Sequence, residues 1–171
     1  MVSFKLDPEE WERLDWRLLQ NSAIALYYDK SILEADVAWL VSHEYRVVSA
    51  QVKDRQSSRD LLAELGTLLA FPAYYGRSLD AFNDCLSDVD VPLNGGLALV
   101  LHHFDLFARL EHSLAQALLD ICADNSRRFL LTGRRFIVLL QSDDPGIAFG
   151  SVGSTPVMWN PHEHLASIRR A

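Results

Sequence analysis

Cysteine is scarce in this chain, which limits the covalent and metal sites that it can build. The 171 residues include two cysteines, Cys85 and Cys122, whose separation does not fit a zinc motif. In a reducing compartment, a buried free thiol is the ordinary state of such a residue. We therefore expect two free, buried thiols and no disulfide.

Compact groups of metal ligands are also lacking. The adjacent His102 and His103 would point to opposite faces of an extended segment, and His162 and His164 would diverge on a helix. Neither pair forms a chelate by itself. We expect surface or strand-end histidines, with no metal and no cofactor.

Sequence signatures of catalysis are absent as well. The glycine-rich stretch 146–153 lacks a phosphate-loop pattern, and no serine, histidine and aspartate occur in a nucleophile-elbow context. The scattered histidines are the one feature that favours an enzyme. We expect that the protein is not an enzyme.

Long apolar runs do not occur. No stretch approaches the roughly 18 consecutive apolar residues of a membrane span. The first ten residues, MVSFKLDPEE, also lack the apolar core of a secretory signal. We therefore expect a cytoplasmic protein with no membrane partner.

Positive charge is in short supply. The chain has 16 Lys and Arg against 23 Asp and Glu, a net charge of -7. Nucleic-acid binding needs clustered Lys and Arg to neutralise phosphates, and the arginine pairs at 127–128 and 134–135 are local. Residues 71–125 contain eight acids against two bases and carry a net charge of -6. The composition argues against a nucleic-acid partner and favours a basic protein.

Apolar segments alternate with amphipathic ones along the chain, which has 49% hydrophobic residues. Strands that are apolar throughout and alternate with helices are typical of a parallel sheet covered by helices. The pattern therefore predicts an α/β fold, with residues 1–171 as a single domain. Strands are expected at 23–28, 45–52, 97–101, 136–140 and 157–159.

The expected helices are marked by caps and by apolar stripes. We predict a first helix at 8–20 that Asp7 starts, a second that Ser31 caps and that ends near His43, and a third that Ser57 caps and Pro72 stops. Further helices are expected at 78–89, at 106–125 and after Asn160. The predicted buried stripes are Leu33, Val37, Leu40 and Val41 in the second helix, and Leu61, Leu62, Leu65, Leu68 and Leu69 in the third.

The helix at 78–89 separates apolar residues from acids. Its apolar residues have the spacing of one buried helix face: Leu79, Phe82, Leu86 and Val89. Asp80, Asp84 and Asp88 follow at intervals of four on the opposite face and must point outward. Like charges four residues apart destabilise a helix slightly. Such a face is either ordinary solvated surface or a site for a cationic partner.

An aromatic loop directly precedes this helix. Tyr74 and Tyr75 lie next to the acidic face, and aromatic residues are enriched at the energetic centres of protein interfaces. Together with the local concentration of negative charge, the two tyrosines favour a site for a cationic protein.

The run FPAYYGRSLDAFNDCL at 71–86 resembles the loop and second helix of the barstar family, whose members are intracellular inhibitors of microbial ribonucleases. The resemblance covers about residues 45–141. It implies a parallel sheet of about three core strands covered by helices. The flanks 1–44 and 143–171 would be extensions that add one or two strands.

The resemblance also implies a site. In this family, the loop and helix plug the active site of the ribonuclease, with an aspartate in place of the RNA phosphate. Tyr74 would cover the catalytic histidine of the nuclease, and Asp80 and Asp84 would be the two carboxylates, with Asp84 in the phosphate site. The implied partner-binding residues are Tyr74, Tyr75, Gly76, Arg77, Asp80, Asn83, Asp84, Ser87 and Asp88.

The implied partner is a secreted microbial-type ribonuclease, against which the protein would give immunity, and a monomer is favoured. A further acid on the helix at 106–125 would be Asp120 or Asp124. Asn83 replaces the tryptophan of the family helix, and Ser87-Asp88-Val89 replaces its Thr-Gly-Trp ending. An alternative is therefore a barstar-fold module that binds a basic protein other than a nuclease.

Overall fold

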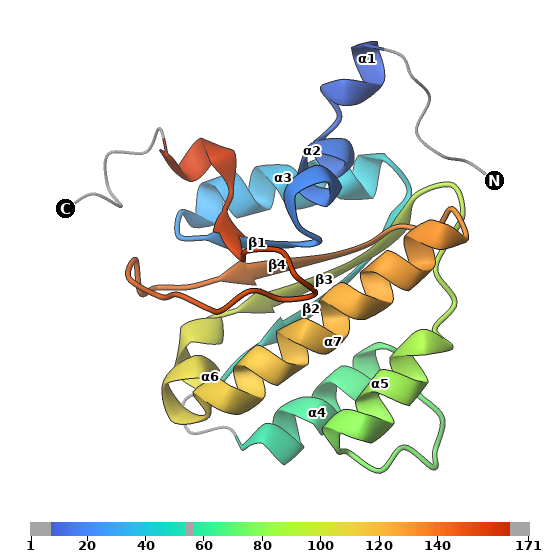
Figure 1. Cartoon of the computed structure of the whole chain (residues 1–171), viewed down its shortest axis with the longest axis vertical. Helices are drawn as coiled ribbons and strands as arrows, with labels where there is room; N and C mark the ends of the chain where they lie inside the picture. The colour runs from blue at the N-terminus through green and yellow to red at the C-terminus, as the bar shows by residue number, and fades with distance from the viewer. Residues whose placement is uncertain (1–7, 54–56, 165–171) are drawn as a thin grey trace.

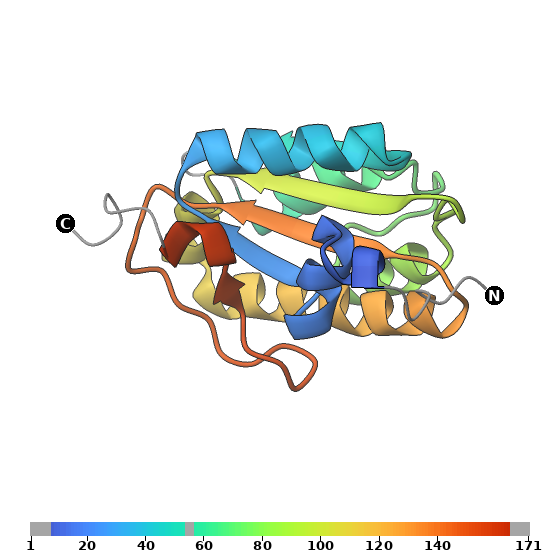
Figure 2. The ribbon, with the colours of Figure 1, turned by 90° about the horizontal axis from the view of Figure 1, so that it is seen from above.

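The protein is an α/β structure in which helices cover both faces of a five-stranded parallel sheet (Figures 1 and 2). This computed structural model describes residues 8–53 and 57–164. The elements are α1 (Pro8–Trp11), α2 (Leu14–Asn21), β1 (Ile24–Tyr27), α3 (Lys30–Ser42), β2 (Tyr45–Gln51), α4 (Ser58–Leu68), α5 (Leu79–Ser87), β3 (Gly96–His102), α6 (Phe104–Leu110), α7 (His112–Leu131), β4 (Phe136–Gln141), β5 (Met158–Trp159) and the 3₁₀ helix η1 (Pro161–His164).

The sheet has the strand order β2-β3-β4-β1-β5, and every neighbouring pair is parallel. Strands β2, β3 and β4 follow one another in space as they do along the chain. The first flank adds β1 beside β4, with Ile24 opposite Val138, and the last flank adds β5 beside β1. The predicted α/β class is confirmed, with three central strands and one strand from each flank.

The sheet separates two apolar cores. In β3, Leu97, Leu99 and Leu101 pack toward α4, α5, α6 and α7, whereas Ala98 and Val100 pack toward α2 and α3. All five side chains are at most 1% exposed. This alternation follows from the two-residue period of a strand, and it explains why the predicted strands are apolar throughout.

The predicted helix at 8–20 is interrupted, and its expected cap, Asp7, lies outside the described residues. Helix α1 ends at Trp11, and α2 begins after Arg13, which has extended backbone angles. The interruption occurs where Asp15 enters the protein interior and Arg13 bonds to it through two nitrogens. Asp15 also pairs with Arg135, 120 residues further along the chain, and a local capping signal does not anticipate this long-range contact.

The predicted burial of one valine and one leucine was wrong. Val41 is 58% exposed and Leu68 is 39% exposed, although both were predicted in buried stripes. In α3, the buried face is centred on Leu33, Asp36 and Leu40 instead. Asp36 can occupy an apolar face because its carboxylate accepts hydrogen bonds from the Tyr27 hydroxyl and from Asn160, each at 2.8 Å. The cap of α3 is Asp29, which accepts from the amide of Ser31.

The helix predicted at 106–125 consists of two helices. Helix α6 ends at Leu110, and α7 starts after Glu111 and continues to Leu131. Glu111 has non-helical backbone angles, and its carboxylate accepts a hydrogen bond from the amide of Ser58 at 3.1 Å. The contact with α4 accounts for the interruption. Where a helix was predicted after Asn160, the described residues 161–164 form a 3₁₀ turn.

A buried ion cluster joins the first flank to the central strands. The Asp15 carboxylate is fully buried and accepts from the Tyr45 hydroxyl at 2.8 Å and from Arg135 Nη1 at 3.0 Å. Burial acts to raise the pKa of Asp15, but the bonds from Arg13 and Tyr45 outweigh it and leave the pKa below its usual value. The cluster therefore fixes α2 against the starts of β2 and β4.

The substitution Asp15→Asn should lower the free energy of unfolding by about 3 to 5 kcal/mol, because it removes the buried carboxylate that pairs with Arg13 and Arg135. A carboxyl whose pKa is lowered by folding contributes stability above its unfolded pKa, 3.8, and loses that contribution as the pH falls through the lower folded value. The stability difference between the wild type and Asp15→Asn should therefore shrink below pH 3.8.

Urea unfolding of both proteins at several pH values measures this difference. The control is Glu34→Gln on α3, which removes an exposed carboxylate and should change stability by less than about 0.5 kcal/mol. An Asp15→Asn variant as stable as the control at pH 7 would contradict the prediction.

Candidate functional site

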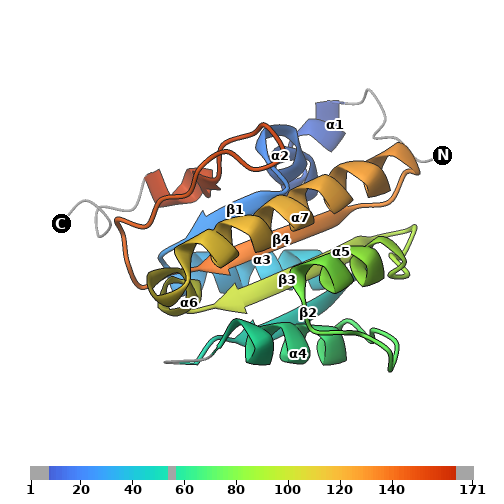
Figure 3. The same cartoon turned by 60° about the horizontal axis from the view of Figure 1, so that its bottom comes forward.

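Helix α5 is a short surface helix held by the core. The helix was predicted at 78–89 and spans Leu79–Ser87; the hydroxyl of Ser78 accepts from the amide of Ala81 at 3.2 Å and caps it. Phe82 and Leu86 are fully buried, and the helix lies against α4 and α7 (Figure 3). The buried side chains fix which face of α5 is turned to solvent.

The three aspartates of α5 form the outward face, which we call the acidic ridge (Asp80, Asp84 and Asp88). All three are exposed, as predicted. Within the described part of the chain, no ion pair joins any of them to a basic side chain. The helix dipole favours Asp80 in the first turn and opposes Asp88 at the C-cap. The ridge is thus an unneutralised negative surface that weakens its own helix slightly.

The two loop tyrosines have different environments. Tyr74 is 81% exposed, so its ring is available to a partner. Tyr75 is turned inward, where its ring makes an edge contact with Phe71 at 5.0 Å and lies against Gly66 of α4. Burial raises the pKa of Tyr75 to about 12. Of the two, Tyr74 has the geometry of a contact residue, and Tyr75 anchors the loop.

In the turn from this loop into α5, the residue with the unfavourable backbone conformation is an arginine. Arg77 has a φ of 56°, in the left-handed region, whereas the neighbouring Gly76 does not have a positive φ. A residue with a β-carbon occupies this region only where the surrounding structure holds it there. From sequence, a left-handed residue would be expected at the glycine.

Asn83, at the position where the family resemblance implies a tryptophan, makes a hydrogen bond within the protein. Its side-chain oxygen accepts a hydrogen bond from Asn125 of α7 at 2.8 Å. Asn125 is fully buried and was not singled out from the sequence, since an isolated asparagine inside a long helix has no local signature. The amide pair joins α5 to α7 beside the acidic ridge.

The two acids that were considered on α7 face the last flank of the chain. Asp120 accepts from the amide of Gly153 at 2.8 Å, and Asp124 lies 3.8 Å from Arg127, which itself bonds to the Gly153 carbonyl. On the side of α7 that faces α5, the residue opposite the ridge is Asn125. The geometry therefore provides neither acid beside α5.

A groove of about 360 Å³ runs between the end of α5 and α7. Asp88 and Asn125 line it together with two cations, Arg128 and Arg134. The basic pairs at 127–128 and 134–135 do not form one patch, because Arg135 is buried against Asp15. The acidic ridge thus ends at a groove of mixed charge.

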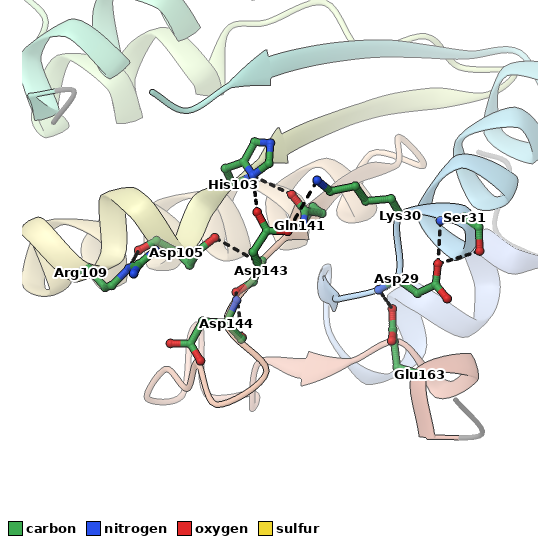
Figure 4. Close-up of polar contacts among 11 residues, drawn as sticks. Asp29, Lys30, Ser31, His103, Asp105, Arg109, Gln141, Asp143, Asp144 and Glu163 are labelled. Atoms are coloured by element: carbon green, nitrogen blue, oxygen red, sulfur yellow. Dashed lines mark hydrogen bonds and ion pairs between the residues drawn. The ribbon is translucent and has the colours of Figure 1, made fainter. Parts of the chain in front are cut away.

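A second polar cluster lies where β1, β3 and β4 end (Figure 4). His103 Nδ1 lies 2.6 Å from the Asp143 carboxylate, which also lies 3.6 Å from Lys30 Nζ. The fully buried Gln141 bonds to the His103 amide and to Asp143. Asp105 accepts from the amide of Asp143 and from Arg109. These bonds join the carboxyl ends of three strands, and His103 has no serine or cysteine nucleophile among its bonded partners.

Two further predictions concern metals and thiols. Among residues 8–53 and 57–164, no group of three histidine, cysteine or acidic side chains could hold a metal ion. Cys85 and Cys122 are free and buried, as predicted, and burial raises the pKa of Cys122 to about 12. In the same described ranges, every helix is too short or too polar to cross a membrane.

The sequence from 45 to 141 matches the family model described as Barstar (barnase inhibitor). The matched segment contains the loop, the acidic ridge and strands β2, β3 and β4. The chain belongs to the barstar family.

One curated relative and one solved structure are also similar to this chain. The chain is 39% identical over 70 residues to the Bacillus subtilis (strain 168) protein named "Putative ribonuclease inhibitor YrdF". The aligned region covers 40% of this chain and 72% of that protein. The fold of this chain is also similar, with a TM-score of 0.50 and 18% identity, to a chain in the structure of Drosophila ORC bound to AT-rich DNA and Cdc6. That similarity covers 94% of this chain and 59% of the other, and it shows a shared fold alone.

The Tyr75 anchor predicts a specific effect of Gly66→Ala. A β-carbon at residue 66 would lie 2.6 Å from two carbons of the Tyr75 ring, so the ring must move. Alanine gains about 1 kcal/mol of helix propensity over glycine, but overpacking costs about 1 to 3 kcal/mol. We expect a net loss of about 1 kcal/mol of unfolding free energy and loss of the nuclear Overhauser contact between Tyr75 and Phe71.

Gly76→Ala is the matched control in the same loop. A β-carbon there would have its nearest contact at 3.7 Å, on Ala81, so this variant should keep the ring contact. If Gly66→Ala leaves the contact between Tyr75 and Phe71 in place, the inference that Tyr75 anchors the loop against Gly66 is wrong.

Proposed function

We propose that this protein is a cytoplasmic, monomeric inhibitor that blocks the cationic active site of a secreted microbial-type ribonuclease. The observation that carries the proposal is the acidic ridge, which is exposed, held by buried side chains, and has no ion pair to any basic residue that the structure describes. Membership of the barstar family and the named ribonuclease inhibitor among its relatives support the same function.

The proposed mechanism is electrostatic and needs no catalysis by this chain. A ribonuclease binds RNA phosphate in a cleft of positive side chains, and a carboxylate that enters the cleft accepts charge-assisted hydrogen bonds. Asp84, in the middle of the ridge, would take the phosphate position, with Asp80 beside it. Tyr74 would cover the catalytic histidine of the nuclease from the loop.

The rigid mounting of the ridge supports tight binding. Phe82 and Leu86 hold α5 in the core, and the Asn83–Asn125 bond holds it against α7. Tyr75 holds the loop on α4. Because these side chains are ordered before binding, less conformational entropy is lost when the complex forms.

Replacement of the central aspartate should weaken inhibition strongly. With Asp84→Ala, the affinity for the nuclease should fall by about 2 to 5 kcal/mol, a range known from buried charge pairs at interfaces such as barnase–barstar. Inhibition of barnase-type and related ribonucleases by the full chain measures this loss. The matched control is Glu34→Ala, which removes an exposed acid from the opposite face of the sheet and should inhibit as the wild type does. Failure of the wild-type chain to inhibit any of these nucleases would contradict the proposal.

Association with the nuclease should depend strongly on salt. The negative charge of residues 71–125 attracts a cationic cleft over a distance of about 8 to 10 Å at physiological ionic strength. Stopped-flow measurements should therefore show an association rate constant that falls by at least about tenfold between low salt and 0.5 M NaCl, with a smaller change in the dissociation rate. A salt-independent association rate would argue against steering by the ridge.

A second candidate function keeps the surface and changes the partner to a basic protein that is not a nuclease. One observation favours it: Asn83, at a position where the family resemblance implies a tryptophan, is engaged with Asn125 inside the protein. A partner captured from the native cell extract by the wild type, but not by Asp84→Ala, distinguishes the two functions. A captured protein without ribonuclease activity supports the second.

A further inference from the structure

A separate cavity of about 280 Å³ lies where the start of α5 meets α4, α6 and α7. Figure 3 shows these four helices together on one side of the sheet. Most of its wall is apolar and comes from four elements: Leu61 and Leu62 of α4, Leu79 of α5, Phe107 of α6, and Leu114 and Leu118 of α7. Small-molecule sites are concave and mostly apolar, with volumes of about 300 to 1,000 Å³, and this cavity is slightly smaller, so it suits a ligand at the small end of that range.

Two cations line the same cavity. Arg59 of α4 and Arg77 of the loop are both exposed residues that contribute to its lining. Within the described residues, neither guanidinium has an ion pair, although Asp60 and Asp80 are close in sequence. Asp60 instead accepts from the Ser57 hydroxyl. Two unpaired guanidinium groups beside apolar walls therefore complement an anion that carries an apolar group.

The position of Arg77 is held by the structure around it. Its left-handed backbone, with a φ of 56°, is unfavourable for a residue with a β-carbon. Ser78, the next residue, is fixed as the cap of α5, and Leu79 follows in the cavity wall. The segment thus presents one cation and one apolar side chain to the same space.

The acids near the cavity do not neutralise these cations. Glu111, between α6 and α7, accepts a hydrogen bond from the amide of Ser58, which also lines the cavity. This bond satisfies a backbone donor, and within residues 8–53 and 57–164 it leaves both guanidinium groups without an ion pair. It also shows that a carboxylate is accepted at the start of α4.

We propose that this cavity binds a small amphiphilic anion, of the class of medium-chain carboxylates, with its chain between the leucines and its head group on Arg59 and Arg77. The apolar walls select the chain, and the two guanidinium groups select the negative head group. This site shares Arg77 with the proposed inhibitory surface, whereas its walls on α4, α6 and α7 lie outside that surface.

Titration of the full chain with sodium decanoate, below its micelle concentration, tests the proposal by nuclear magnetic resonance and calorimetry. Chemical-shift changes should centre on Leu62, Leu79 and Leu118. Affinity should fall about fourfold for each methylene removed in the series decanoate, nonanoate, octanoate. Decanol, which lacks the charge, and sulfate, which lacks the chain, should each bind at least about tenfold more weakly than decanoate.

Two variants separate the head-group and chain contacts. Arg59→Gln should weaken decanoate binding about tenfold without a change in unfolding temperature, whereas the matched Arg46→Gln on β2 should have no effect. Leu114→Trp, at a half-buried wall position, should fill the cavity and abolish binding. Equal binding of decanol and decanoate, an unaffected Arg59→Gln, or shifts scattered over the surface would each overturn the proposal.

Discussion

The structure depends on the burial of both faces of one parallel sheet. Strand β3 is covered completely on each side, and a parallel sheet with this composition is stable only when helices exclude water from both faces. Helices α4 to α7 supply one cover, and α2 and α3 supply the other. Since α2 and α3 precede the segment that matches the barstar family, this chain uses its first flank as half of the core.

Polar bonds at defined positions attach the flanks to that core. Asp15 joins α2 to Tyr45 and Arg135, while Asn160 of the last flank bonds to Tyr27 and Asp36. These partners are buried, so each missing bond would leave an unsatisfied group away from water. The flanks are therefore specified by geometry as well as by apolar burial, and they lie on the sheet far from the acidic ridge of α5 (Figure 1).

Features that depend on residues near one another in sequence were predicted, whereas features that depend on contacts between distant elements were missed. The strands and α5 were predicted correctly because apolar runs and helical apolar spacing are set within a few residues. The interruptions at Arg13 and Glu111 were missed because each depends on a partner in a distant element, Asp15 with Arg135 in one case and Ser58 in the other. Val41 and Leu68 satisfied a helical spacing but lie where no neighbouring element covers them.

By itself, the sequence determined that Asp80, Asp84 and Asp88 point outward, because helical periodicity places them opposite the apolar residues whatever the rest of the chain does. It also determined the family, through the loop and helix motif at 71–86. Only the tertiary structure decided that Tyr75 turns inward onto Gly66, that Asp120 faces the last flank, and that Arg59 and Arg77 share a cavity. Each of these depends on packing between separate elements, which local spacing does not encode.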